Sequence, residues 1–367
     1  MSETLLVSTR KGLFTLERSG GSWNIASVDF LGDNVTLAMA DPRDGRRYAA
    51  LDHGHFGVKV HRWDRGKWQE IATPTYPPKP EGLDEKDFWG RPIQWSTHRI
   101  WALEPGGANQ PGVIWCGTLP GGLFRSDDHG GNWAIVESLW RHPKRPQWMG
   151  GGADWPGIHS ICVHPADSNQ VTIAVSTGGL WHTGDGGESW TQRGEGMRAE
   201  HVPPELTHDP VAQDVHCLVQ CPADPARMWI QHHNGIFVSS DEGLTFSEIS
   251  AAAKPSAFGF PVAVHPHDPD TAWFVPEIKD EKRIPASGKL VVSRTRDGGR
   301  TFTVLSSGLP QFHAYDVVYR HALTVDKTGE RLAMGSTTGG LWISENQGDS
   351  WTEISHTLPQ VYAVRFA

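Results

Sequence analysis

Histidine is the residue type with the greatest chemical potential in this sequence. The chain has 19 histidines among 367 residues, and four of them open short apolar segments: His98 (HRIWALEP), His159 (HSICVHP), His216 (HCLVQCP) and His321 (HALTVD). Neutral imidazole is a common protein ligand of zinc, iron, copper and manganese. If the fold brings these four side chains together, they would bind a divalent metal ion, which is the cofactor we expect.

Two carboxylates accompany these histidines. Asp214 stands two residues before His216, and Glu277 follows the apolar segment TAWFVP. A carboxylate near a metal ion orients a ligand or acts as a general base, so we take both as candidate catalytic residues, together with His232 of the QHHNG segment. A structural role is the alternative for the four histidines, since an imidazole at a strand start can simply hydrogen-bond a neighbouring carbonyl.

A repeated motif indicates the elements that must position these residues. Five segments share the pattern S/T-x-D/N-x-G-x-x-aromatic: SDDHGGNW (126–133), TGDGGESW (183–190), SSDEGLTF (239–246), TRDGGRTF (295–302) and SENQGDSW (344–351). Two degenerate copies end at Trp23 and Trp68, so the closing aromatics recur on average every ~55 residues. Each motif predicts a tight turn, because Asp bonds back to its own backbone and Gly accepts a positive φ.

Each motif belongs to a unit of four predicted strands. An apolar segment such as GLFRS or GLWHT precedes the motif, a second such as VIWCGT precedes that, and a third often ends in proline. Short strands at even spacing with one turn motif per group are typical of a β-propeller. The chain begins on a second strand (4–8) and ends on a lone first strand (360–366), so the two fragments complete one blade. We therefore expect an all-β, seven-bladed propeller that forms one domain over residues 1–367.

This fold predicts where the chemistry lies. The first strand of each blade lines the central channel and begins at the face opposite the motif turns, so the four histidines converge on one mouth of the channel. Loops between second and third strands reach the same face. Long tryptophan-rich loops lie there too, and they could form walls for a sugar ring or an aromatic group. The candidate substrate-binding residues on this face are His53, His55, His233, Trp95, Trp155 and His313.

Composition limits the classes of function. The formal net charge is −9 with an isoelectric point near 6.1, and the basic residues are scattered, so a nucleic-acid partner is not expected. No segment resembles a signal peptide or an apolar membrane span, so we expect a protein of the cytoplasm without a membrane partner. The four cysteines lack a metal-binding spacing and are expected to be free thiols in a reducing compartment.

The five motifs resemble the Asp-box, or BNR, repeats of sialidases, sortilin-type receptors, some xyloglucanases and photosystem II assembly factors. The whole chain is similar to bacterial BNR-repeat proteins described as glycosyl hydrolase-like or sialidase-like. This resemblance implies the propeller fold, whereas the turns themselves are usually remote from an active site. Sialidases carry an Arg-Ile-Pro motif whose arginine binds a carboxylate, and the resemblance makes Arg283 of KRIP a candidate catalytic residue, although the segment follows the third complete motif instead of preceding the first.

Three functions remain open. The first is an enzyme that acts on a small molecule at the channel mouth with a metal ion, as a hydrolase, lyase or oxygenase. The second is a non-catalytic propeller that binds other proteins. The third is a glycosidase that uses Asp214 and Glu277 on a carbohydrate substrate, which would require two carboxyl groups roughly 5–10 Å apart.

Overall fold

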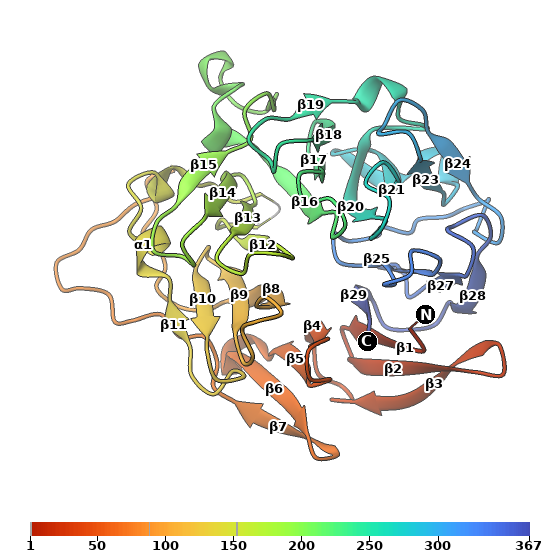
Figure 1. The fold of residues 1–367 in the computed structure, drawn as a ribbon, viewed down its shortest axis with the longest axis horizontal. Helices are drawn as coiled ribbons and strands as arrows, with labels where there is room; N and C mark the ends of the chain where they lie inside the picture. The colour runs from red at the N-terminus through yellow and green to blue at the C-terminus, as the bar shows by residue number, and fades with distance from the viewer. Residues whose placement is uncertain (1, 88, 152) are drawn as a thin grey trace.

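The computed structural model describes residues 2–87, 89–151 and 153–367, and these residues form seven antiparallel sheets arranged in a ring, six with four strands and one with five (Figure 1). The first two blades in chain order are β29 (Val361–Phe366), β1 (Thr4–Thr9), β2 (Gly12–Ser19) and β3 (Ser22–Asp29), then β4 (Val35–Ala40), β5 (Arg47–Asp52), β6 (Val58–Asp64) and β7 (Lys67–Ile71). The expected all-β, seven-bladed propeller is confirmed.

The next three blades follow the same order from the channel outwards. They comprise β8 (Arg99–Pro105), β9 (Ile114–Leu119), β10 (Leu123–Ser126) and β11 (Ala134–Ile135); β12 (Ile158–Val163), β13 (Val171–Val175), β14 (Gly179–Thr183) and β15 (Thr191–Arg193); and β16 (Val215–Gln220), β17 (Met228–His232), β18 (Gly235–Ser239) and β19 (Ser247–Glu248).

The last two blades complete the ring. They comprise β20 (Phe258–Val264), β21 (Ala272–Lys279), β23 (Val292–Thr295) and β24 (Thr303–Leu305), with β22 (Lys282–Pro285) paired to β21, and β25 (Leu323–Val325), β26 (Leu332–Gly335), β27 (Leu341–Ser344) and β28 (Thr352–Ser355). Helical turns occur in the connections: α1 (Glu137–Trp140), η1 (Gly54–Phe56), η2 (Arg145–Gln147), η3 (Pro204–Leu206), η4 (Pro210–Ala212), η5 (Ser250–Ala252) and η6 (Ala286–Gly288). No helix in the described ranges is long and apolar enough to cross a membrane.

The two ends of the chain share one blade, as the sequence predicts. Strand β29 pairs antiparallel with β1, with Leu5 opposite Phe366 and Val7 opposite Val364, and the termini lie together in Figure 1. This pairing covers the inner edge of β1, which would otherwise expose unpaired backbone groups. Large aromatic side chains on second and third strands then fill the spaces between blades. Trp115, Trp181, Trp229, Trp273 and Trp342 are among the largest fully buried side chains.

The five repeated turns have one hydrogen-bond pattern. In the first, the Ser126 hydroxyl donates to Asp128 Oδ1 over 2.9 Å, and the Asn132 amide donates to the same oxygen over 2.8 Å. Gly130, with φ of 81°, donates its amide to Ser126 Oγ over 2.8 Å. Because each turn joins the third and fourth strands of a blade, the turns lie on one face of the ring. The strand starts that carry the candidate site lie on the opposite face, which we call the upper face.

Candidate functional site

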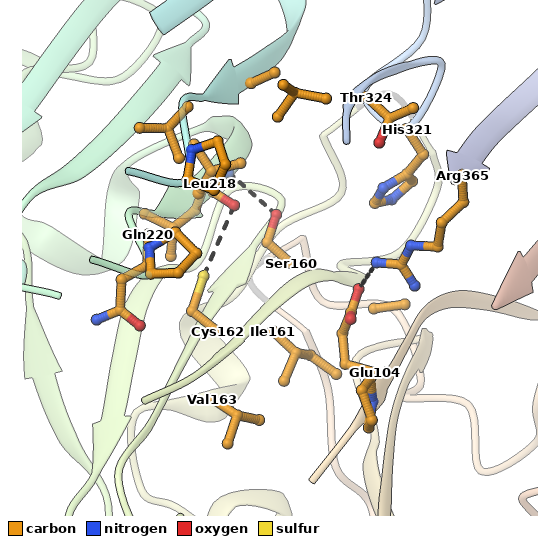
Figure 2. A pocket seen from close by; sticks show the side chains of 18 of the residues that line it. Glu104, Ser160, Ile161, Cys162, Val163, Leu218, Gln220, His321, Thr324 and Arg365 are labelled. Carbon is orange, nitrogen blue, oxygen red and sulfur yellow. Dashed lines mark hydrogen bonds and ion pairs between the residues drawn. The ribbon is translucent and has the colours of Figure 1, made fainter. Parts of the chain in front are cut away.

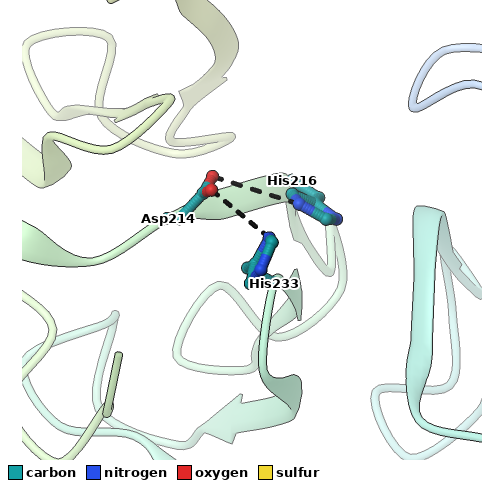
Figure 3. A group of neighbouring side chains, drawn as sticks. All are labelled: Asp214, His216 and His233. Atoms are coloured by element: carbon teal, nitrogen blue, oxygen red, sulfur yellow. Dashed lines mark ion pairs between the residues drawn. The ribbon is translucent and has the colours of Figure 1, made fainter. Parts of the chain in front are cut away.

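A cluster of two histidines and one aspartate forms where two strands of the fifth blade meet. Asp214 precedes β16 and His233 follows β17, and the register of the sheet places Val215 opposite His232. The Asp214, His216 and His233 side chains therefore point toward one another (Figure 3). Their nearest ligand atoms all lie within 4.8 Å of one another. Asp214 Oδ2 is 3.5 Å from His233 Nδ1, and Asp214 Oδ1 is 4.0 Å from His216 Nε2.

Local contacts prepare these groups to bind a cation. His216 Nδ1 lies 2.7 Å from the carbonyl oxygen of Gly259, so this nitrogen donates and Nε2 carries the free lone pair toward Asp214. Burial lowers the pKa of His216 to about 4, so its imidazole is neutral at neutral pH. Burial would raise the pKa of Asp214, but the imidazoles of His216 and His233 outweigh it, and the pKa falls below its usual range.

The donor set suits a divalent transition metal. Two imidazole nitrogens and one carboxylate leave open coordination positions, as in catalytic zinc and non-haem iron sites. Ligands of one tetrahedral zinc ion lie roughly 3.3 Å apart, given metal–ligand distances of ~2.0–2.1 Å. The observed separations thus require the side chains to close by at most about 1.5 Å, which rotation about their side-chain bonds can supply.

A cavity of about 510 Å³ opens on the same upper face. Its lining combines aromatic rings with three arginines and comes from strand starts and upper-face loops: Asn34, Thr36, Leu37, Arg99, Trp101, Phe260, Arg283, Val317, Tyr319, Arg320, His321, Thr337, Gln360 and Tyr362. Phe260 connects it to the metal-ligand cluster, because its ring stacks on that of His216 with centroids 4.8 Å apart. A second connection runs through Asp280, which pairs with Arg283 and lies 3.8 Å from His233 Nε2.

A larger cavity of about 910 Å³ is lined by first strands around the channel and reaches the first-to-second strand turns at His164 and His267, on the face of the repeated turns. Figure 2 shows some of the side chains that line it. First strands form its wall, and Arg365 pairs with Glu104 across it. Leu37, Arg320 and His321 line both cavities, so these three residues lie between the upper cavity and the channel. The floor of the upper cavity therefore combines two polar residues beside the seventh blade with one apolar residue of β4.

Glu277 is a buried carboxyl group on the same face. Its residue is 1 % exposed, and neither carboxyl oxygen has a well-aligned hydrogen-bond partner among the described residues, although the Val318 amide approaches it. Burial raises the pKa of Glu277 to about 8, with a smaller contribution from Asp316. Glu277 is therefore protonated at neutral pH, whereas Asp214 is ionised.

The four histidines predicted as one metal shell do not form one group with metal-binding geometry among the described residues, although His159 lies near enough to His216 and His321 for their charges to affect its pKa. His98 is exposed, and its ring stacks on Trp155 with centroids 4.6 Å apart. His159 is fully buried, with Nδ1 2.9 Å from Ser160 Oγ; Nε2 has no well-aligned hydrogen-bond partner among the described residues, although the Val215 backbone approaches the ring. His321 lies at the floor between the cavities. Among the described residues, only His216 of the four joins a group with metal-binding geometry, because its partners come from its own blade instead of from the ring.

The other candidate residues lie in the cluster, in the cavity lining, in the interior or in the rim loops. His233 is a member of the cluster, and Arg283 lines the upper cavity. His232 is fully buried and accepts the Asn234 amide at Nδ1 over 3.0 Å, and burial lowers its pKa to about 3. The remaining candidates lie in rim loops: His53 beside Asp33, His55 against Phe56, Trp95 against Trp140, and the exposed His313.

Three residues near the site are not among the candidates chosen from the sequence. Arg320 and Trp101 line the upper cavity, with the guanidinium carbon 4.3 Å from the centre of the indole. His201 lies beside the cluster, its ring centroid 5.2 Å from that of His233. The sequence carried one signal for Arg320: it stands directly before His321, so a positively charged side chain lies at the start of a strand that lines the channel.

No family model matches this chain. A curated relative is 26 % identical over 270 residues, 66 % of this chain and 30 % of the relative; it is named "Probable oligoxyloglucan-reducing end-specific xyloglucanase" and comes from Neosartorya fischeri. The chain thus spans less than a third of that relative's length.

Solved structures share the fold at low identity. An ancestral GH74 enzyme is 18 % identical with a TM-score of 0.59, over 88 % of this chain and 38 % of that one. YCF48 from Cyanidioschyzon merolae is 14 % identical with a TM-score of 0.57, over 94 % and 96 %. YCF48 bound to a D1 peptide is 12 % identical with a TM-score of 0.51, over 87 % and 80 %. The chain is thus a seven-bladed propeller whose structural neighbours include a GH74 enzyme and YCF48.

Proposed function

We propose that this protein is a metal-dependent enzyme that acts on a small molecule at the upper face of the propeller. The observation that carries the proposal is the buried cluster of Asp214, His216 and His233, whose ligand atoms lie within 4.8 Å of one another beside a cavity of about 510 Å³. The hydrogen bond to the Gly259 carbonyl fixes the His216 tautomer. At neutral pH His216 is neutral and Asp214 is ionised, and both forms can bind a cation. The five repeated turns lie on the face opposite the cluster, and their resemblance to Asp-boxes supports a structural role for them.

The cluster would hold a zinc, iron or manganese ion. When bound, such an ion supplies Lewis acidity, which polarises a substrate oxygen or lowers the pKa of a coordinated water. The protein contributes orientation: Gly259 fixes the His216 ring, and Asp280 faces the outer nitrogen of His233. Phe260 lines the cavity and stacks on His216 of the cluster, so a substrate in the cavity would lie against this ring.

The experiment is metal analysis of protein purified without added metal or chelator. We expect one equivalent of a transition metal in the wild type and loss of the metal in Asp214→Asn. Asp128→Asn, at a turn on the opposite face, is the control and should retain the metal. A wild type that neither contains metal nor takes up zinc, manganese or ferrous ion after reconstitution would exclude the proposal.

A glycosidase is the second candidate, and two observations favour it. The curated relative is named as a xyloglucanase. Asp214 and Glu277 also have pKa values displaced in opposite directions, which is the arrangement of a base and an acid. Release of reducing ends from xyloglucan oligosaccharides by chelator-treated protein, abolished by Glu277→Gln, would favour this function over the metal enzyme.

A further inference from the structure

The charge of the upper cavity indicates what it binds. Arg99, Arg283 and Arg320 line it, and no carboxylate is among the described residues of its lining. Arg99 faces Asp52 over 3.4 Å and Arg283 pairs with Asp280, but neither acid reaches the lining. Arg320, the third, has no such acid within ion-pair distance among the described residues, so the cavity carries a positive charge that an entering anion would balance.

Arg320 is the residue that most requires such an anion. Its Nη1 is shielded from solvent without a hydrogen-bond partner, and no salt bridge to it is found in the described part of the chain. Burial lowers its pKa to about 10, opposed by Asp214, and nearby Arg283 lowers it further. The group therefore stays charged at neutral pH. Arg320 as a whole is half-buried, but a shielded donor of a charged group is costly to leave unpaired, and such groups are normally paired with an ion or a ligand.

The other walls of the cavity are suited to the carbon skeleton of a small organic molecule. The indole of Trp101 lies under the Arg320 guanidinium, and Phe260 lies between Arg283 and the metal-ligand cluster. Tyr319 and Tyr362 stack with centroids 6.4 Å apart at an angle of 13°, and they form another wall. Flat apolar walls with a few polar groups are the usual environment of a small ligand of sugar or aromatic size.

We propose that the upper cavity binds a small organic oxyanion, a carboxylate or a phosphate monoester, with the charged group on Arg320 and the body between the aromatic walls. Resting on the proposed function, this assigns the substrate of the metal enzyme to the anionic class. Arg283 and Arg99 lie at the rim and attract the anion, while Arg320 at the floor fixes its orientation. The reacting end would then extend over Phe260 toward His216.

Calorimetric titration of chelator-treated protein tests the inference without the metal. The probes are D-glucuronate, glucose 1-phosphate and neutral glucose, which share a ring and differ in the charged group. We expect one of the two anions to bind with a dissociation constant below about 10 mM and glucose not to bind. Whichever anion binds more tightly identifies the carboxylate or the phosphate as the recognised group, and added chloride should weaken it.

Two variants locate the site, and a third controls for net charge. Arg320→Gln should raise the dissociation constant at least about tenfold and Arg283→Gln by a smaller factor, because each removes a charge-assisted contact. Arg283 is half exposed, so this variant tests the cavity even if Arg320→Gln fails to fold. Arg300→Gln, at an exposed turn on the opposite face, should leave binding unchanged.

The outcomes separate this inference from the proposed function. Anion binding in protein that takes up no metal would uphold the anion site and reject the metal enzyme. Metal uptake without binding of either anion would reject the anion site alone. Binding of glucose as tight as that of the anions, or equal loss of binding in Arg300→Gln, would also overturn the inference.

Discussion

The two faces of this propeller use polar residues in opposite ways. On the face of the repeated turns, Asp185 accepts hydrogen bonds from the Thr183 and Ser189 hydroxyls and the Ser189 amide, with the turn exposed to water. On the upper face, the two carboxyl oxygens of Glu277 and Nη1 of Arg320 are shielded from solvent and have no well-aligned hydrogen-bond partner among the described residues. A fully paired polar group contributes to stability, whereas a shielded and unpaired one costs free energy. The difference indicates that the turns stabilise the fold and that the upper face is retained for binding.

The largest effect should come from replacing Glu277. The pKa of Glu277 is about 8 in the fold against 4.5 for an ordinary glutamate, so between these pH values the folded protein holds a proton that the unfolded chain releases. The free energy of unfolding of the wild type therefore falls as the pH rises from 5 to 9. Glu277→Gln should remove up to roughly 3–5 kcal/mol of this fall. Urea unfolding at several pH values measures it.

Glu281→Gln is the matched control for this change. Glu281 is exposed near the end of β21, so its replacement should leave the pH dependence of unfolding as in the wild type. If Glu277→Gln and Glu281→Gln give the same pH profile, Glu277 is ionised in the folded protein. The contrast between the two faces would then not hold for this residue.

The second effect concerns the two possible sets of metal ligands. His233→Ala removes a member of the cluster and should weaken zinc or manganese binding at least about 100-fold, because losing a direct ligand costs at least as much as losing a partner that orients one. His98→Ala removes an exposed histidine of the set proposed from sequence and should change the affinity less than about twofold. Competition titration with a chromogenic chelator measures both affinities. An equal loss of metal affinity in the two variants would instead support the metal site predicted from the sequence, in which histidines from separate blades bind one ion.

The fold could be predicted from the sequence because its signal is repeated. One motif with an Asp, a Gly and an aromatic residue recurs along the chain, and β29 pairs with β1 as the incomplete ends require. The site lacks that redundancy. Asp214, His216 and His233 were each singled out, but in three different roles, because repeat equivalence favours contacts across the ring. The actual neighbours follow from the hairpin of β16 and β17. Arg320 was missed because its position directly before His321 shows that it lies near the start of an inner strand, but nothing in the sequence shows that its Nη1 will lack a hydrogen-bond partner.

A third effect should appear on the face of the turns. Asp185→Ala removes the acceptor of three hydrogen bonds in a solvent-exposed turn, so we expect a loss of about 1 kcal/mol in the free energy of unfolding. Metal affinity should not change, since the turn lies on the opposite face. The urea midpoint measures the first quantity and chelator competition the second. A variant that unfolds normally but binds metal poorly would show that the faces are coupled.

The smallest effect should come from the one repeated turn that lacks an aspartate. Asn346 accepts from the Ser344 hydroxyl and the Ser350 amide, both over 2.9 Å, in the place that Asp185 and Asp297 take elsewhere. Its Nδ2 donates to Ser350 Oγ, whereas in the other turns a carboxylate oxygen accepts there. Asn346→Asp would make these bonds charge-assisted, but Glu345 and Asp349 are neighbouring acids that repel the new charge.

We therefore expect Asn346→Asp to raise the free energy of unfolding by only about 0.5 kcal/mol at pH 7. Hydrogen bonds hold the pKa of Asp185 and Asp297 below the usual range, and the new carboxyl should behave alike. Such a group stabilises the fold above its unfolded pKa, and the gain disappears as the pH falls below about 4. Urea midpoints at pH 7 and pH 3 test the sign. Destabilisation at pH 7 would mean that repulsion from Glu345 and Asp349 outweighs the hydrogen bonds, and that this turn keeps asparagine because of its charged neighbours.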